Sequence, residues 1–116
     1  MTSGSTPASD ADATTPEGTT RVDRSFGKRG GGYALTEIRR TGDGHRLRVR
    51  IHRDPYEHQS HGVVEVLTPT LTWTALADEP ASAWHPTTPY RSTSPTPLAD
   101  LAERLFQRAV AILRVE

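Results

Sequence analysis

Residues 33–53 read YALTEIRRTGDGHRLRVRIHR, and this stretch decides what the chain can fold into. Its second half alternates apolar and basic residues, which is the period of a β-strand with two unlike faces. Asp43-Gly44 lies between two such runs and is typical of a two-residue hairpin turn, because a type I′ turn needs positive φ at both central positions. The stretch therefore predicts two antiparallel strands, residues 33–41 and 45–53.

A two-residue turn also predicts which side chains share a face of this hairpin. Ile38 would lie opposite Val49 on an apolar face, and Glu37 would lie opposite Arg50 on a basic face, which would also carry Tyr33. We call the basic set the arginine stripe; it comprises Arg39, Arg46, Arg48, Arg50 and His52. Directly opposed like charges destabilise a sheet, so this face needs water, the carboxylates of Glu37 and Glu65, or an anionic partner.

The rest of the chain supplies further strands and a helix. Residues 62–68 (GVVEVLT) and 70–77 (TLTWTALA) predict two strands, and Pro69 between them fits a tight turn or a bent edge. Residues 96–114 place apolar side chains at i, i+3, i+4 and i+7, which predicts an amphipathic helix. We expect a small α+β domain: an antiparallel meander of three to four strands with one face packed by the C-terminal helix.

The N-terminal part differs in composition from this domain. Residues 1–20 are small, polar and acidic, and they cannot bury enough apolar surface to offset the entropy of ordering. Residues 21–32 are basic and end in three glycines, which reads as a flexible joint. We expect residues 1–32 to be a disordered tail and residues 33–116 to be a single folded domain.

Composition excludes several classes of protein. The chain has 116 residues, no cysteine, 34% hydrophobic residues and a formal net charge of zero. Without cysteine there is no disulfide scaffold or thiolate metal site. No apolar run approaches a membrane span, and the start of the chain lacks the pattern of a signal peptide. We therefore expect a cytoplasmic protein that does not bind a membrane.

A second candidate region is the histidine-rich segment 52–61 (HRDPYEHQSH). Imidazoles near carboxylates can bind a divalent metal or transfer protons, but this spacing matches no metal motif, and Asp54-Pro55 is typical of a turn. We assign no metal ligand, catalytic residue or cofactor here; residues 54–61 fit a solvent-exposed structural connection, with a loop that recognises a ligand or partner as the alternative. The proline-rich segment 78–95 follows, with Trp84 and Tyr90 as anchors.

Three functional hypotheses follow. The first is a non-catalytic interaction module that binds a protein partner, or a second copy of itself, through the exposed sheet face and the 54–61 loop. The alternative is nucleic-acid binding through the arginine stripe and the basic tail. The third is a metal-dependent enzyme that uses the 52–61 cluster. The candidate binding residues are Arg39, Arg46, Arg48, Arg50, His52, Tyr56, Glu57, His58, His61 and Trp84.

Overall fold

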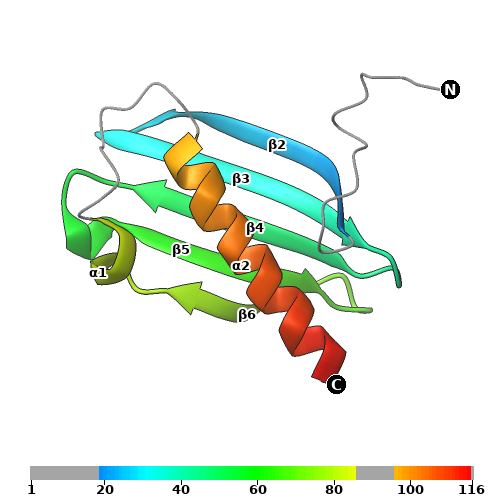
Figure 1. Cartoon of the computed structure of the whole chain (residues 1–116). Helices are drawn as coiled ribbons and strands as arrows, with labels where there is room; N and C mark the ends of the chain where they lie inside the picture. Colours follow the sequence, from blue (N-terminus) through cyan, green and yellow to red (C-terminus); the bar gives the residue numbers. More distant parts are fainter. Residues whose placement is uncertain (1–18, 86–95, 116) are drawn as a thin grey trace, which may run out of the picture.

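The computed structural model describes residues 19–85 and 96–115, which form a sheet with helices beside it. The elements are β2 (Thr19–Arg29), β3 (Gly32–Thr41), β4 (Arg46–Arg53), η2 (Glu57–Gln59), β5 (His61–Leu67), β6 (Trp73–Glu79), α1 (Ala81–Trp84) and α2 (Thr96–Val115). The strands are antiparallel in the order β2-β3-β4-β5-β6, and α2 crosses one face (Figure 1). The predicted α+β meander with a covering C-terminal helix is confirmed, with five strands instead of three to four.

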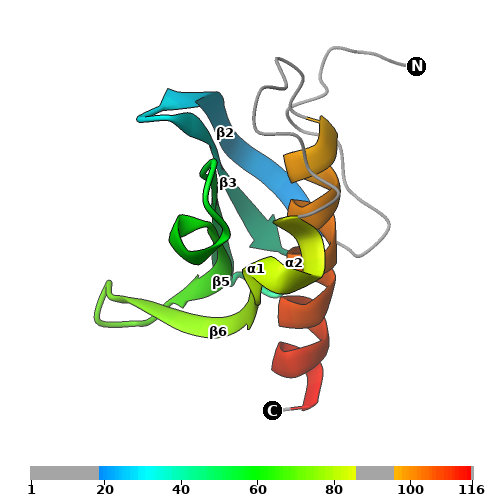
Figure 2. The same cartoon turned by 90° about the vertical axis from the view of Figure 1, so that its left-hand side faces the viewer.

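The core lies between α2 and the face of the sheet that carries the apolar side chains of β4. Helical spacing places Leu101 and Leu105 on the buried side of α2. Gly62 allows this approach, because a Cβ there would lie 3.3 Å from Leu101. The buried apolar residues are Leu35, Leu47, Val49, Ile51, Val64, Trp84, Leu98, Leu101, Ala102, Leu105, Phe106 and Ala109. We call the sheet face turned away from α2 the open face (Figure 2).

The prediction of a disordered tail over residues 1–32 is wrong for the part that the structure describes. Residues 19–29 form β2 and pair along β3, so the folded domain extends beyond the predicted 33–116. The strand escaped the sequence analysis because it lies at the sheet edge, and Arg21 and Arg24 precede Phe26 on its covered side, so its sequence lacks a regular apolar alternation. Residues 1–18 lie outside the described part.

Of the three glycines predicted as a flexible joint, two form the β2–β3 hairpin turn and the third begins β3. Arg29 pairs with Gly32, which leaves Gly30 and Gly31 as a two-residue turn with a φ of 59° at Gly30. Positive φ at that position favours glycine, since it has no Cβ. At Gly32 the constraint is space, because a Cβ would lie 1.9 Å from the carbonyl oxygen of Arg53.

The β3–β4 hairpin has a three-residue loop, so the predicted two-residue turn is wrong. The amide of Gly44 donates to the Thr41 carbonyl at 3.1 Å, and the Thr41 amide donates to the His45 carbonyl at 2.8 Å. Gly44 has a φ of 97°, which is the left-handed residue that follows a β-turn in such loops. The Thr41 hydroxyl also accepts from the His45 amide at 2.9 Å and stabilises the loop.

The additional loop residue shifts β3 by one position against β4 and exchanges the two faces of β3. Glu37 pairs with Val49, and Ile38 pairs with Arg48. Glu37 and Arg39 therefore lie on the covered face, where both are buried. Ile38 lies on the open face, which reverses its predicted place opposite Val49.

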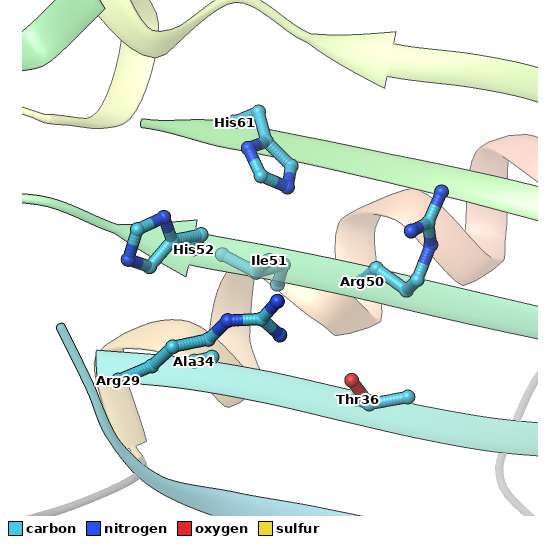
Figure 3. A pocket seen from close by; sticks show the side chains of 7 residues that line it. All are labelled: Arg29, Ala34, Thr36, Arg50, Ile51, His52 and His61. Atoms are coloured by element: carbon cyan, nitrogen blue, oxygen red, sulfur yellow. The ribbon is translucent and has the colours of Figure 1, made fainter. Parts of the chain in front are cut away.

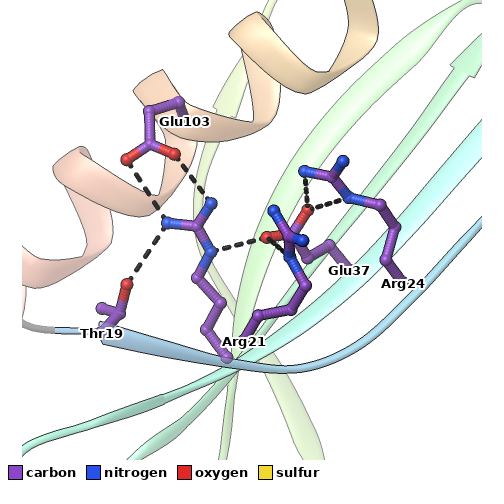
Figure 4. Close-up of polar contacts among 6 residues, drawn as sticks. Thr19, Arg21, Arg24, Glu37 and Glu103 are labelled. Carbon is purple, nitrogen blue, oxygen red and sulfur yellow. Dashed lines mark hydrogen bonds and ion pairs between the residues drawn. The ribbon is translucent and has the colours of Figure 1, made fainter. Parts of the chain in front are cut away.

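A buried ion cluster accommodates these charges beneath α2 (Figure 4). The Glu37 carboxylate accepts hydrogen bonds from Arg39 at 2.6 Å and from Arg24 at 2.7 Å, with Arg21 at 3.5 Å. Arg39 in turn donates to Glu103 of α2 at 2.7 Å. Burial alone would raise the pKa of Glu37, but the hydrogen bonds and charges of Arg39 and Arg24 outweigh it and hold that pKa below its usual value.

The two predicted downstream strands correspond to β5 and β6, although β6 begins at Trp73 and ends at Glu79. Pro69 lies in a tight turn, which resolves the two alternatives for this residue. The Leu71 amide donates to the Thr68 carbonyl at 2.8 Å, and the φ of Leu71 is 64°. A proline fits this turn because it needs no backbone hydrogen-bond donor there.

The tight packing at the β2–β3 turn is testable with two glycine substitutions. Gly32→Ala is expected to lower the free energy of unfolding by about 3 kcal/mol, because its Cβ would overlap the Arg53 carbonyl. Gly27→Ala is the matched control in β2, since its Cβ would meet no heavy atom within 4 Å. Urea denaturation measures both. Equal stabilities would contradict the close approach of Gly32 to the Arg53 carbonyl at the end of β4.

The ion cluster predicts a pH-dependent contribution to stability. Because the pKa of Glu37 is lowered on folding, its stabilisation is complete above the unfolded-state pKa and is lost as the pH falls through the folded-state pKa. Glu37→Gln is expected to cost about 3–5 kcal/mol at neutral pH and to flatten the acid limb of the stability curve. Urea denaturation between neutral and acidic pH measures this.

The control for this substitution is Glu57→Gln, which changes the same functional group on the exposed η2 turn. It is expected to leave both the stability and its acid limb unchanged, because the group it alters is solvated. If the stability of Glu37→Gln fell with decreasing pH as steeply as that of the wild-type protein, this would contradict the role of the buried cluster.

Candidate binding surface on the open sheet face

β4 lines the open face with basic side chains, as its alternation predicts. Arg46, Arg48, Arg50 and His52 point away from α2, while the residues between them are buried beneath it. We call these four residues the β4 row. Successive members are about 6.6 Å apart along the strand, because each residue of a strand advances about 3.3 Å. The row therefore forms a regular line of cationic and imidazole groups across the sheet.

One carboxylate on β5 binds the middle of this row. Glu65 accepts from Arg48 Nε at 2.8 Å and from Arg50 Nε at 3.0 Å and Nη2 at 2.9 Å. Burial would raise the pKa of Glu65, but these hydrogen bonds and the arginine charges hold it below its usual value. Two guanidinium groups share one carboxylate, so the middle of the row keeps a net positive charge.

The second carboxylate expected on this face is absent from it. Glu37 lies on the covered face with Arg39, so neither contributes to the basic surface, and Arg39 is removed from the predicted arginine stripe. Arg40 takes a place on the open face and lies directly opposite Arg46 in the β3–β4 ladder. Within the described residues, no carboxylate forms an ion pair with Arg29, Arg40 or Arg46.

A pocket of about 150 Å³ lies at the end of the β4 row (Figure 3). It is lined by Arg29, Ala34, Thr36, Arg50, Ile51, His52 and His61. These residues come from the last position of β2, from β3, from the second half of β4 and from the start of β5. Arg29 extends across Ala34, whose small side chain leaves room for it. We call this feature the open-face pocket.

The two histidines of the open-face pocket lie in a positive environment. Their ring centroids are 5.8 Å apart. Burial and the positive charges of His52, Arg50 and Arg29 lower the pKa of His61. His52 Nε2 is buried without a hydrogen-bond partner, and its nearest carboxylate oxygen, Asp54 Oδ2, is 4.0 Å away. The positive environment of this pocket and the guanidinium group of Arg29, which has no carboxylate partner among the described residues, favour an anion there.

The aromatic residues of the sheet are not where the sequence analysis placed them. Tyr33 lies on the covered face and stacks on Phe26 with ring centroids 5.9 Å apart, so its predicted place on the basic face is wrong. Trp73 of β6 lies on the open face, with the guanidinium carbon of Arg48 4.4 Å from its ring centroid. The single open-face tryptophan of the described residues is thus already stacked by an arginine.

The 54–61 loop is held by hydrogen bonds from its own residues. The Asp54 amide donates to Ser60 Oγ at 2.9 Å, and the Tyr56 amide donates to Asp54 Oδ1 at 3.0 Å. Tyr56, Glu57 and His58 are exposed, whereas His61 lies in the open-face pocket. Among the described residues, no group of three or more histidines or carboxylates is arranged to hold a metal ion.

Trp84, the last of the predicted binding residues, belongs to the core. Its side chain is buried, and its indole nitrogen donates to the Glu79 carbonyl at 3.3 Å. It therefore anchors α1 against the sheet, as expected for the segment that follows β6, and is not accessible to a partner. The other predicted anchor, Tyr90, lies outside the described residues.

Arg29 is the site residue that the sequence analysis missed as part of the fold. From the sequence it is assigned to a flexible tail because residues 21–32 are basic and end in three glycines. The available signal was the Gly30-Gly31 pair, since two glycines between extended segments are also typical of a hairpin turn. Such a hairpin would have placed Arg29 at the edge of the basic face.

No family model, curated protein or solved structure matches this chain. The helices within residues 19–85 and 96–115 are too short or too polar to cross a membrane.

The electrostatics of the open-face pocket predict the titration of one histidine. His61 is expected to titrate below the usual histidine range, and Arg29→Gln is expected to raise its pKa by removing a nearby positive charge. Arg40→Gln is the matched control, because Arg40 does not line the pocket. NMR titration of the imidazole protons measures both. An unchanged His61 pKa in Arg29→Gln would contradict the placement of Arg29.

Proposed function

We propose that this protein is a non-catalytic binding module whose open sheet face contacts an anionic macromolecule, with the phosphate backbone of nucleic acid as the favoured partner. The observation that carries the proposal is the removal of Glu37 from this face. A solvated basic face balanced by Glu37 and Glu65 was the competing explanation, and of these two carboxylates only Glu65 lies on the open face. The strand register also places Asp23 and Asp78 on this face, but neither forms an ion pair with its arginines among the described residues.

The arrangement of the cations supports a backbone contact. At one end of the β4 row, Arg46 lies opposite Arg40 of β3. At the other end, the row reaches the pocket that contains Arg29. Guanidinium groups match the geometry of phosphate. Cations that have no carboxylate partner can also bind phosphate without breaking an ion pair within the protein. Stacking on bases is not supported, because Trp73 already stacks with Arg48.

The test uses the whole chain and labelled duplex DNA, single-stranded DNA and RNA in fluorescence anisotropy titrations over a range of salt concentrations. Arg40→Gln with Arg46→Gln is expected to weaken binding and to reduce the slope of log K against log salt by about two. These two arginines are preferred to Arg48 and Arg50, because removing the latter would leave Glu65 buried without its partners.

The charge-matched control is Arg104→Gln with Arg114→Gln, which removes two arginines from exposed positions of α2. It is expected to leave the salt slope unchanged. Absence of binding at low salt, or equal losses in the two double variants, would contradict backbone contact through the open face.

A protein contact is a second candidate, favoured by the 54–61 loop. Tyr56 is 64% exposed, although the loop that carries it is held by the hydrogen bonds of Asp54 and Ser60. A rigidly presented tyrosine is a common energetic centre of protein interfaces. Sedimentation analysis tests the simplest partner, a second copy: a dimer that Tyr56→Ser dissociates would support this candidate, and a monomer at all concentrations would exclude self-association.

A further inference from the structure

We propose that the open-face pocket binds a terminal phosphate monoester, the end group of a nucleic-acid strand that lies along the β4 row. The inference rests on the proposed function, because it assigns one end of the bound strand to one place on the open face. It goes beyond backbone contact, because it predicts that the protein distinguishes phosphorylated from hydroxyl strand ends.

The pocket offers hydrogen-bond donors that the protein itself leaves unused. Arg29 forms no ion pair within the described residues. Arg50 uses Nε and Nη2 for Glu65, while its Nη1 has no carboxylate partner in the described part. The volume of about 150 Å³ far exceeds the need of one water molecule, so a tetrahedral oxyanion has room to enter.

The charge of the pocket favours a dianion over the single charge of a phosphodiester. Arg29 and Arg50 contribute two positive charges, and Glu65 balances part of the second. Burial and the cationic neighbours of His61 oppose its charged form, and a bound anion would favour that form. The acids near the pocket are Glu65, bound to Arg50, and Asp54, which is 4.0 Å from His52. A phosphate monoester carries about −1.5 to −2 charges at neutral pH.

The position of the pocket favours a strand end over a point within a strand. It lies where the β4 row ends at His52, beside the 54–61 loop. The β2–β3 turn packs on that loop: the position that a Cβ on Gly31 would occupy is 3.4 Å from the Pro55 side chain. Figure 2 shows the η2 segment of the loop on the open-face side of the sheet, so the row meets protein beyond His52.

The experiment compares short oligonucleotides of one sequence that carry a 5′-phosphate, a 3′-phosphate or only hydroxyl ends. Binding to the whole protein is measured by competition at constant salt. One of the phosphorylated ends is expected to improve the affinity roughly tenfold, as for added charge-assisted hydrogen bonds. Arg29→Gln and His61→Gln are each expected to abolish this advantage. Arg40→Gln lies outside the pocket and is expected to weaken all three oligonucleotides while preserving the ratio between them.

A second measurement separates failure of this inference from failure of the proposed function. Inorganic phosphate is titrated into the protein, and the imidazole resonances of His52 and His61 are followed by NMR at constant ionic strength. If all oligonucleotides bind equally well, the end-group inference is overturned and backbone binding stands. If no oligonucleotide binds, the proposed function fails and the strand-end inference fails with it. In that case, if phosphate still shifted the resonances of both histidines, and Arg29→Gln removed these shifts, the result would show only that the pocket binds phosphate. Phosphate binding without these shifts would place the anion elsewhere and overturn the inference.

Discussion

The fold depends on how a fully buried carboxylate, Glu37, is satisfied. Removing a carboxylate from water is costly unless cations and hydrogen bonds replace the water, and here Arg24 of β2 and Arg39 of β3 do so. Arg39 is held by Glu103 of α2 and by the ring of Phe106, 4.2 Å from its guanidinium carbon. The cluster is complete only when β2 and α2 are both docked, so it couples the edge strand to the helix.

The same cluster determines the character of the opposite face. A chain with zero formal net charge presents a basic surface because its charges are sorted between two sides of one sheet. Glu37 and Glu103 pair with arginines on the covered side, whereas on the open side Glu65 pairs with both Arg48 and Arg50, and Asp23 and Asp78 form no ion pair among the described residues. Net charge is therefore a poor guide to what this protein binds, since binding responds to the local field of one face.

The open-face pocket is likewise a product of the strand order. Arg29 and His52 lie where β2 and β4 end, and His61 lies where β5 begins. Antiparallel pairing brings the end of β2, the end of β4 and the start of β5 to the same end of the sheet, where the strands terminate. The 54–61 loop joins β4 to β5 there, which explains why the histidines on both sides of the loop come together.

The sequence by itself determined the elements whose signal is local. The period-two pattern of β4 and the helical spacing of α2 each require burial of one side, and this correctly indicated the sheet, the covering helix and the basic side of β4. Tertiary structure decided the faces of β3 and the existence of β2. Asp43-Gly44 is compatible with loops of two or three residues, and one residue of difference exchanges every side chain of β3. From the sequence, Glu37 and Arg39 are expected at the surface because they are charged. Their burial is stabilised by Arg24 and Glu103, which only the folded chain places next to them.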